Sequence, residues 1–325
     1  MNLRERYYAL VLLFLFQSGA SCEMAQIVRA SNLFVLGDVT GSGLKIQGPI
    51  TAKGNGLLLG ANTNSIYMQG NLNLVSTNVL GKIAVGGSFA ATASRFGEVS
   101  RVLQPLHDFQ AIGQDLIADS ILLASTNPNG LISRDLNGIL TLEGMDPKLN
   151  VFLIENPGPY SNLNIMVPAE STAIVNILGK SPYVFQNVFN GSSLDLDGFD
   201  PSRVLFNFPN ATTLSLVNNR ISGTIFAPRA TVTMSGTTMS GSLIANKLSI
   251  KTSNMYEIGF QGQFTNVPQS IPEPSNLILM SLSSVVMIVY RILKRQNNSV
   301  ELNHCKLSLQ EFRISYLVER IRSRT

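Results

Sequence analysis

Few residues of this chain combine the type and spacing that metal binding or catalysis requires. Three carboxylates, Asp195, Asp197 and Asp200, lie close together and offer oxygen ligands to calcium. The segment lacks the further ligands and the terminal glutamate of a calcium loop, so we expect a solvated turn instead. His107 is the only histidine outside the C-terminal tail, and its surroundings favour a surface position over the role of a general base.

Hydroxyl side chains form a second candidate group. Thr231, Thr233, Thr237 and Thr238 would present an outward array of the kind that ice binding requires, although threonine also simply suits β-strands. A polysaccharide-active enzyme would need paired carboxylates on successive turns, and none are visible. No nucleophile elbow, Walker loop or zinc-protease motif occurs either. We therefore predict no catalytic residues, no cofactor and no metal site.

An internal repeat indicates which elements position these residues. Residues 221–232 line up with residues 239–250, and their apolar, polar and glycine positions match. A short fixed period with one strand in each copy is typical of a solenoid, because one copy cannot bury its apolar face without a stacked neighbour. Short strands bounded by glycine, such as 33–39 and 70–75, extend this pattern. We predict a mostly β fold, a right-handed β-solenoid over residues 31–262, with its outermost turn shielded.

One segment breaks the β pattern. Apolar residues recur every three to four positions over residues 96–123, which predicts a long amphipathic α-helix. Ser94 is the predicted N-cap, Glu98 would lie in the first turn, and Pro105 should kink or split the helix. We expect the helix to pack along one side of the solenoid, with His107 on its exposed surface.

The strands that follow have a different composition. Residues 138–142, 150–154, 173–178 and 203–208 are nearly all apolar, as expected for strands covered on both sides. Asn-Gly links of the kind that join antiparallel strands are sparse, which favours parallel coils.

Charge and cysteine content narrow the class of protein. The net charge is +4, but the segment from Arg291 onward contributes +5, so the rest of the chain carries −1. The folded body therefore lacks the basic excess of a nucleic-acid binder. The two cysteines, Cys22 and Cys305, lie outside this body, which has neither a disulfide framework nor a cysteine metal site.

The N-terminus resembles a secretory signal peptide over residues 1–25. Two arginines precede an apolar run at 7–16, and Ser18 and Ala20 provide small residues for cleavage, with Ala25 as a later option. A lipoprotein site at Cys22 is the alternative, but the preceding Gly-Ala-Ser lacks the expected large aliphatic residue.

The C-terminus carries a second sorting pattern. A linker at 263–276 contains a Pro-Glu-Pro motif, an uncharged run predicts a transmembrane helix at 277–293, and a basic tail occupies 294–325. Positive charge after the run predicts that this tail is cytoplasmic and that the body faces outward. The residues of this pattern are Pro272, Glu273, Pro274, Arg291, Lys294 and Arg295.

This pattern resembles the PEP-CTERM sorting signal of Gram-negative bacteria, a resemblance that implies processing by an exosortase-type enzyme. One departure is that thirty residues follow Arg295, whereas the family usually ends within a few residues of the basic cluster.

The body is similar to the choice-of-anchor A family. The resemblance implies an exported adhesive domain without characterised chemistry, and more distantly an ice-binding β-solenoid with a helix along its side. The phrases that carry it are residues 34–43, 84–87, 146–152, 202–212 and 223–230.

Our leading hypothesis is an exported, non-catalytic protein, anchored in the membrane of the cell envelope or released to the surface. It would act as a surface adhesin or extracellular matrix component that binds a polysaccharide or protein ligand and no nucleic acid. The alternatives are a polysaccharide-active enzyme on the same scaffold and an ice-binding protein.

Overall fold

The computed structural model describes residues 31–102, 107–155, 162–179, 182–186 and 200–262. The predicted signal peptide, Pro-Glu-Pro linker, transmembrane helix and basic tail lie outside these residues. The same holds for the residues predicted to act there, which are Ser18, Ala20, Ala25, Pro272, Glu273, Pro274, Arg291, Lys294 and Arg295. No helix within the described ranges has the length and apolar character that crossing a bilayer requires.

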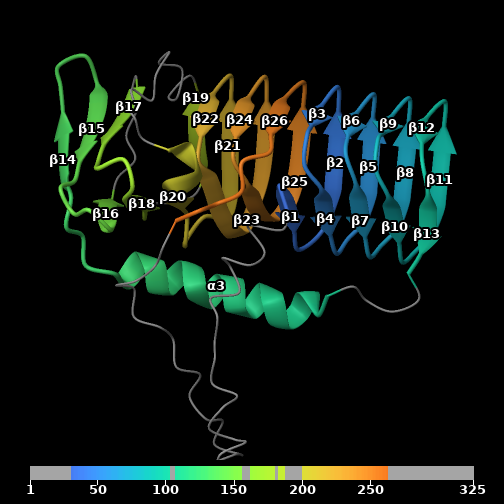
Figure 1. Ribbon diagram of the computed structural model, residues 1–325, viewed down its shortest axis with the longest axis horizontal. Helices are drawn as coiled ribbons and strands as arrows, with labels where there is room; N and C mark the ends of the chain where they lie inside the picture. Colours follow the sequence, from blue (N-terminus) through green and yellow to red (C-terminus); the bar gives the residue numbers. More distant parts are fainter. Residues whose placement is uncertain (1–30, 103–106, 156–161, 180–181, 187–199, 263–325) are drawn as a thin grey trace, which may run out of the picture. The chain divides into compact units, whose positions relative to one another are not determined.

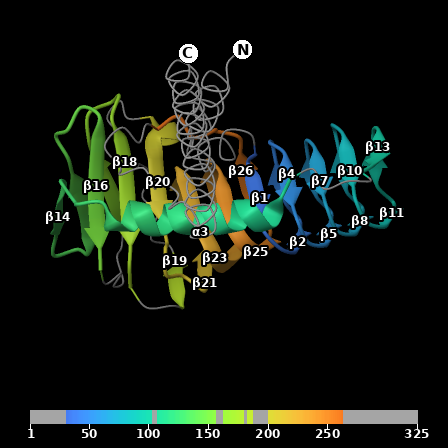
Figure 2. The ribbon, with the colours of Figure 1, turned by 90° about the horizontal axis from the view of Figure 1, so that it is seen from below.

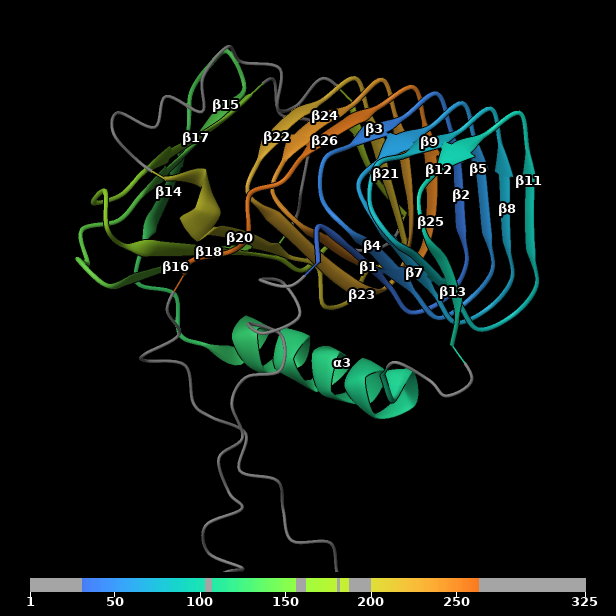
Figure 3. The same ribbon diagram turned by 45° about the vertical axis from the view of Figure 1, so that its right-hand side comes forward.

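The strands form a solenoid of parallel coils with three faces (Figure 3), which confirms the predicted class of fold. Face A carries the inner strands beside the helix. Its strands are β1 (Leu33–Val35), β4 (Ile50–Ala52), β7 (Ile66–Met68), β10 (Ile83–Val85), β13 (Val99–Arg101), β16 (Leu149–Ile154), β18 (Thr172–Ile177) and β20 (Val204–Asn207), with the first parts of the long strands β23 (Thr224–Ser235) and β25 (Leu243–Lys251). The right-handed sense of the coil stays a prediction.

Two further faces complete most of the coils. Face B consists of β2 (Val39–Ser42), β5 (Gly56–Leu59), β8 (Leu72–Val75), β11 (Phe89–Thr92), β19 (Tyr183–Gln186), β21 (Thr213–Val217) and the second parts of β23 and β25. Face C is a seven-stranded sheet of β3 (Lys45–Ile46), β6 (Asn62–Thr63), β9 (Asn78–Val79), β12 (Arg95–Phe96), β22 (Arg220–Ser222), β24 (Thr238–Ser240) and β26 (Asn254–Tyr256).

The first described strand, β1, lies in the middle of the solenoid. Leu33 of β1 is in register with Ile50 of β4 on one side and with Leu243 of β25 on the other. An N-terminal stack (residues 33–101) therefore runs outward from the first coil. A C-terminal stack (residues 131–256) builds back toward it, so the last coil meets the first (Figure 1).

The number of residues in each coil is nearly constant. In the N-terminal stack, Leu33, Ile50, Ile66, Ile83 and Val99 occupy one inward position on face A, sixteen or seventeen residues apart. In the C-terminal stack Ile221 pairs with Met239, so the eighteen-residue repeat seen in the sequence is confirmed as the offset between two coils.

Side chains at the corners hold neighbouring coils in register. The Asp38 carboxylate accepts a hydrogen bond from the Asn55 amide at 2.8 Å, and Asn55 Oδ1 accepts one from the Asn71 amide at 3.0 Å. Asn71 Oδ1 repeats the contact with the Ser88 amide at 2.8 Å. Each coil thus satisfies a backbone N–H that the corner would otherwise leave unpaired.

The helix α3 (Phe109–Ser125) begins later than the sequence pattern predicts. Its N-cap is Asp108, whose side chain accepts from two backbone amides of the first turn, so the assignment to Ser94 was wrong. Ser94 instead accepts a hydrogen bond from the Thr77 amide at 3.1 Å, within a coil, and Glu98 pairs with Lys82 at 3.7 Å. The predicted start failed because the coil spacing of residues 95–101 also fits a helical period. Pro105 lies outside the described residues.

The predicted position of the helix beside the solenoid is confirmed. Figure 2 shows α3 lying across face A, where Leu116 packs with Phe34 and Phe226 in a buried cluster. At its centre Ser120 Oγ donates to Asn207 Oδ1 at 2.5 Å, and Asn207 Nδ2 donates to the Asn176 side chain at 2.8 Å. All three polar residues are buried, so these bonds fix the helix on the sheet.

The ends of the solenoid differ from the prediction. The outermost coil of the N-terminal stack is exposed, and Arg101 occupies the inward position that Val85 fills one coil earlier. At the other end the structure adds a small sheet, β14 (Leu131–Arg134), β15 (Ile139–Glu143) and β17 (Asn162–Met166), in which β14 and β15 are antiparallel. We did not predict this hairpin, whose turn is capped by the Asp135 carboxylate.

We predict that Gly241→Ala destabilises the protein by about 3 kcal/mol, because its φ of +148° disfavours a side chain and an added Cβ would overlap the Gly223 carbonyl oxygen of the next coil. Gly60→Ala is the matched control, since Gly60 (φ +58°) has open space around the new methyl group. Gly60→Ala should lower the free energy of unfolding by only about 1 kcal/mol, from the strain of a left-handed backbone. Urea denaturation of both variants measures the difference; equal losses would contradict the close approach of the coils.

We predict that Asn207→Ala lowers the free energy of unfolding by about 3 kcal/mol, since the Ser120 carbonyl and the Asn176 side chain lose their buried donor. Asn73→Ala, at an exposed position on face B, should stay within about 0.5 kcal/mol of the unsubstituted protein. A similar small loss for both variants in chemical denaturation would show that α3 is not held by this network.

Candidate functional site

Face B is the surface on which outward side chains follow the most regular geometry. Its parallel strands pair without a break from β19 to β11, and no described helix covers them (Figure 1). Alternate residues of each strand point outward, so side chains in register form rows across the strands. The middle row consists of Val184, Ser215, Thr233, Ser249, Thr40, Leu57, Asn73 and Ala90.

Four consecutive members of the middle row carry a hydroxyl group. This hydroxyl stretch comprises Ser215, Thr233, Ser249 and Thr40, and the last three are exposed. Neighbouring strands of a sheet lie about 4.8 Å apart, and outward residues along one strand about 6.7 Å. The stretch therefore offers hydroxyl groups at regular spacing, because every strand is in register with its neighbours.

The rest of face B is more apolar. Leu57 and Leu59 on β5 are 38% and 39% exposed, and Val75 on β8 is in register with Leu59. Two cations border the hydroxyl stretch on β25, where Lys247 pairs with Asp38 at 3.9 Å and Lys251 is exposed. Face B thus combines hydroxyl, aliphatic and cationic side chains on one flat sheet. Such a surface suits contact with an extended partner better than the enclosure of a small substrate.

The structure brings together only half of the predicted threonine array. Thr231 and Thr233 point outward from β23 on face B. Thr237 is buried at the next corner, where its hydroxyl donates to the Leu216 carbonyl at 3.0 Å, and Thr238 lies on face C. The hydroxyl surface is instead completed by Ser249 and Thr40, which come from β25 and β2.

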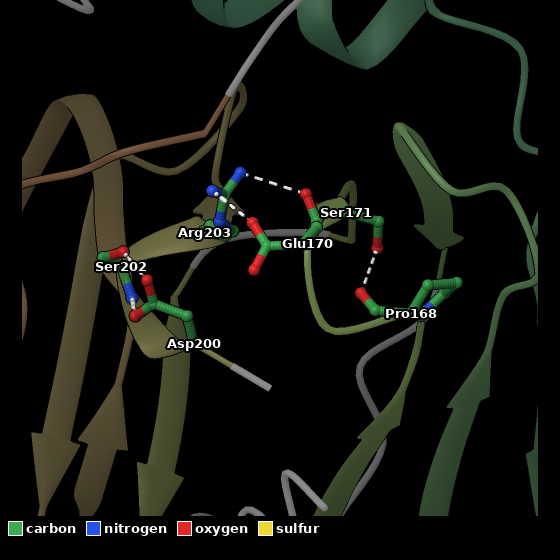
Figure 4. A network of polar contacts seen from close by, with 6 residues as sticks. All are labelled: Pro168, Glu170, Ser171, Asp200, Ser202 and Arg203. Atoms are coloured by element: carbon green, nitrogen blue, oxygen red, sulfur yellow. Dashed lines mark hydrogen bonds and ion pairs between the residues drawn. The ribbon is translucent and has the colours of Figure 1, made fainter. Parts of the chain in front are cut away.

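The predicted carboxylate turn lies mostly outside the described residues, where Asp195 and Asp197 fall. Asp200 caps the 3₁₀-helix η1 (Pro201–Arg203) by accepting a hydrogen bond from the Ser202 amide at 2.8 Å. Beside it, Arg203 donates to the Glu170 carboxylate at 2.8 Å and to the Glu170 carbonyl at 3.0 Å (Figure 4). The segment that begins at Ser202 therefore ties the start of β20 to the start of β18, so its role is structural.

The segment that begins at Asp146 also has a structural role, because the Asp146 carboxylate caps a turn. The backbone N–H of Lys148, followed in importance by that of Leu149, holds the pKa of Asp146 below its usual value. The ionised carboxylate thus stabilises this turn at neutral pH, and that contribution is lost as the pH falls through the lowered pKa. Asn150 closes the same turn through its Nδ2, which donates to the Asp146 carbonyl at 2.8 Å.

We expected His107 to lie within the helix, which was wrong: it precedes the N-cap, Asp108. Its ring is exposed and lies edge-on to Phe34 and Phe109, at centroid distances of 6.4 and 5.7 Å. Among the described residues no group of three or more His, Cys, Asp or Glu side chains is arranged to hold a metal ion.

The sequence contained a signal for face B that we did not use. A glycine followed by Asp, Asn or Ser recurs at residues 37–38, 54–55, 70–71 and 87–88, at the spacing of the coils. Each copy marks the corner between faces A and B. Counting from it would have identified Thr40, Leu57 and Asn73 as one row.

A family model described as "Putative Ice-binding-like adhesive domain" matches residues 26–257 of this chain. The chain belongs to this family. The match includes both stacks, so the adhesive domain contains the junction between the first and last coils as well as all of face B. A search of curated proteins finds no match.

Three solved structures similar to this adhesive domain are described as ice-binding proteins. The protein of the Antarctic ascomycete Antarctomyces psychrotrophicus is 11% identical, with 73% of this chain and 97% of that chain covered and a TM-score of 0.30. A protein from an Antarctic biological consortium is 11% identical, with 71% of this chain and 89% of that chain covered and a TM-score of 0.34. The DUF3494 domain of Shewanella frigidimarina ice-binding protein 1 is 12% identical, with 72% of this chain and 97% of that chain covered and a TM-score of 0.33.

Proposed function

We propose that this protein is an exported, non-catalytic adhesin or extracellular matrix component that attaches through face B. The observation that supports this function most directly is the unbroken, register-matched row of outward side chains across the face. A flat partner would contact many of these side chains at once. Weak individual contacts then add up to firm attachment without a deep pocket.

The proposal includes export and anchoring by the terminal segments. The signal peptide at 1–25 would direct secretion, and the Pro-Glu-Pro segment with its hydrophobic run would hold the protein at the envelope after recognition by an exosortase-type enzyme. A family described as adhesive is consistent with this location. The ligand class that we propose is an extracellular polysaccharide or protein.

The alternative of a polysaccharide-active enzyme has less support. Such an enzyme would place two carboxyl groups on either side of the bond that it cleaves. The strands of faces B and C carry no Asp or Glu in the described residues, so their rows offer no such pair.

We predict that Thr40→Tyr combined with Ser249→Tyr lowers attachment about tenfold or more, because two adjacent rings would interrupt the flat middle row. Tyrosine suits strands, so the fold should persist. The assay is retention of beads carrying the full-length protein on glycan and collagen arrays. Gln110→Tyr with Gln114→Tyr, at exposed positions of α3, is the control and should leave retention unchanged. Failure of the unsubstituted protein to bind any array would refute the proposal.

The hydroxyl stretch favours ice binding as a second candidate, since its regular spacing would order water on a lattice. We predict that the unsubstituted protein shapes ice crystals and shows thermal hysteresis, and that the Thr40→Tyr, Ser249→Tyr variant shows neither. A nanolitre osmometer measures both effects. Freezing without hysteresis or faceted crystals would exclude this candidate and leave the adhesin proposal standing.

A further inference from the structure

Face C presents a second ordered row, whose chemistry differs from that of face B. The first residue of each of its seven strands points outward and is in register with the first residue of the next strand, from β22 at one end to β12 at the other. The cationic row consists of Arg220, Thr238, Asn254, Lys45, Asn62, Asn78 and Arg95. Every member is a cation, an amide or a hydroxyl.

The cations of this row are evenly spaced. Arg220, Lys45 and Arg95 occupy every third strand, which places them about 14 Å apart along the face at the usual strand spacing. All three are exposed, and none is within 4.0 Å of a carboxylate in the described part of the chain. The positive charge of face C is therefore available to a ligand.

The amide and hydroxyl groups lie between these cations. Asn254 and Asn62 are exposed beside Lys45, and each side-chain amide can both donate and accept hydrogen bonds. A second outward row adds the hydroxyl of Ser240 next to Tyr256, whose half-buried ring lies on the same surface. This mixture matches a polymer that carries many hydroxyl groups and periodic negative charge.

Charge is sorted among the sides of the molecule. The strands of face C carry no Asp or Glu, whereas α3, on face A, contains Asp115 and Asp119, has Asp108 as its N-cap, and carries no Lys or Arg. The side of the domain that carries α3 is therefore acidic, whereas the outward row of face C is cationic. The local field of the row, and not the overall charge of the chain, would direct binding.

We propose that face C binds an acidic polysaccharide rich in uronic acids along the cationic row. Carboxylates of the glycan pair with Arg220, Lys45 and Arg95, and sugar hydroxyls bond to the amides between them. A single-stranded nucleic acid would call for several stacking aromatic side chains, and Tyr256 is the only aromatic residue that points outward from these strands. A membrane surface would call for exposed apolar side chains, which the row lacks.

The inference rests on the export proposed above but not on attachment through face B. Each exposed ion pair contributes little, so affinity arises from several contacts to one chain. The glycan must then span six strand intervals, about 29 Å, to reach all three cations. Affinity should rise with chain length up to that span and fall as salt screens the charges.

The test measures binding of the full-length protein to sodium alginate, with neutral dextran as the comparison. We expect alginate binding that weakens between 50 and 500 mM NaCl, ionic strengths over which the Debye length shortens from about 14 Å to about 4 Å. Lys45→Gln, Arg95→Gln and Arg220→Gln together should lower the affinity about tenfold and flatten the salt dependence. Circular dichroism and melting temperature establish that this triple variant is folded.

The matched control removes the same charge elsewhere. Lys53→Gln, Lys82→Gln and Lys148→Gln change three exposed lysines outside the strands of faces B and C and should leave alginate affinity within about twofold. An equal loss in both triple variants, or equal binding of dextran, would overturn the inference. Tighter binding of a single-stranded oligonucleotide than of alginate would also overturn it. The Thr40→Tyr, Ser249→Tyr variant should still bind alginate, so failure on face B and failure on face C are distinguishable.

Discussion

Pairing between the first and the last coils is the contact on which the remaining structure depends. Leu33 pairs with Leu243, Val39 with Leu248 and Lys45 with Asn254, so the junction closes all three faces at once between residues more than two hundred positions apart. Contacts of such sequence separation form only after a large loss of chain entropy. The hydroxyl stretch crosses this junction from Ser249 to Thr40, so the surface proposed to bind exists only when the ends of the domain have met.

The helix determines which surfaces remain open. Because α3 covers face A, the strands beneath it are buried on both sides. Their outward positions include apolar residues such as Leu205 and Phe226, and Asn176 and Asn207, which bond to α3. Faces B and C have no such cover in the described residues, so the outward side chains of their strands are open to a ligand. The same packing places the acidic residues of α3 away from the cations of face C. The packing of α3 on face A thus determines both which faces stay uncovered and where the acidic side chains of α3 lie.

The sequence predicted the solenoid and its register better than its topology. The match between residues 221–232 and 239–250 is the pairing of Ile221 with Met239, because stacked strands repeat the same environment at the same offset. The helix start was misplaced since residues 95–101 satisfy both the coil period and a helical one. The junction had no local signal, because β1 and β25 are brought together by tertiary stacking alone. The rows of face B were accessible in principle from the repeated glycine corners.

The exposed outer coil explains how such a surface can grow without uncontrolled assembly. Each coil adds one member to the rows of faces B and C, so the N-terminal stack lengthens both surfaces beyond the junction and raises the number of simultaneous contacts. An open solenoid end would also attract other strands, since its edges are unpaired. Arg101 places a charge where the inner coils have Val85, Met68 and Ala52, and burying it against another chain would be costly. The end can therefore stay open while the faces beside it carry the contacts.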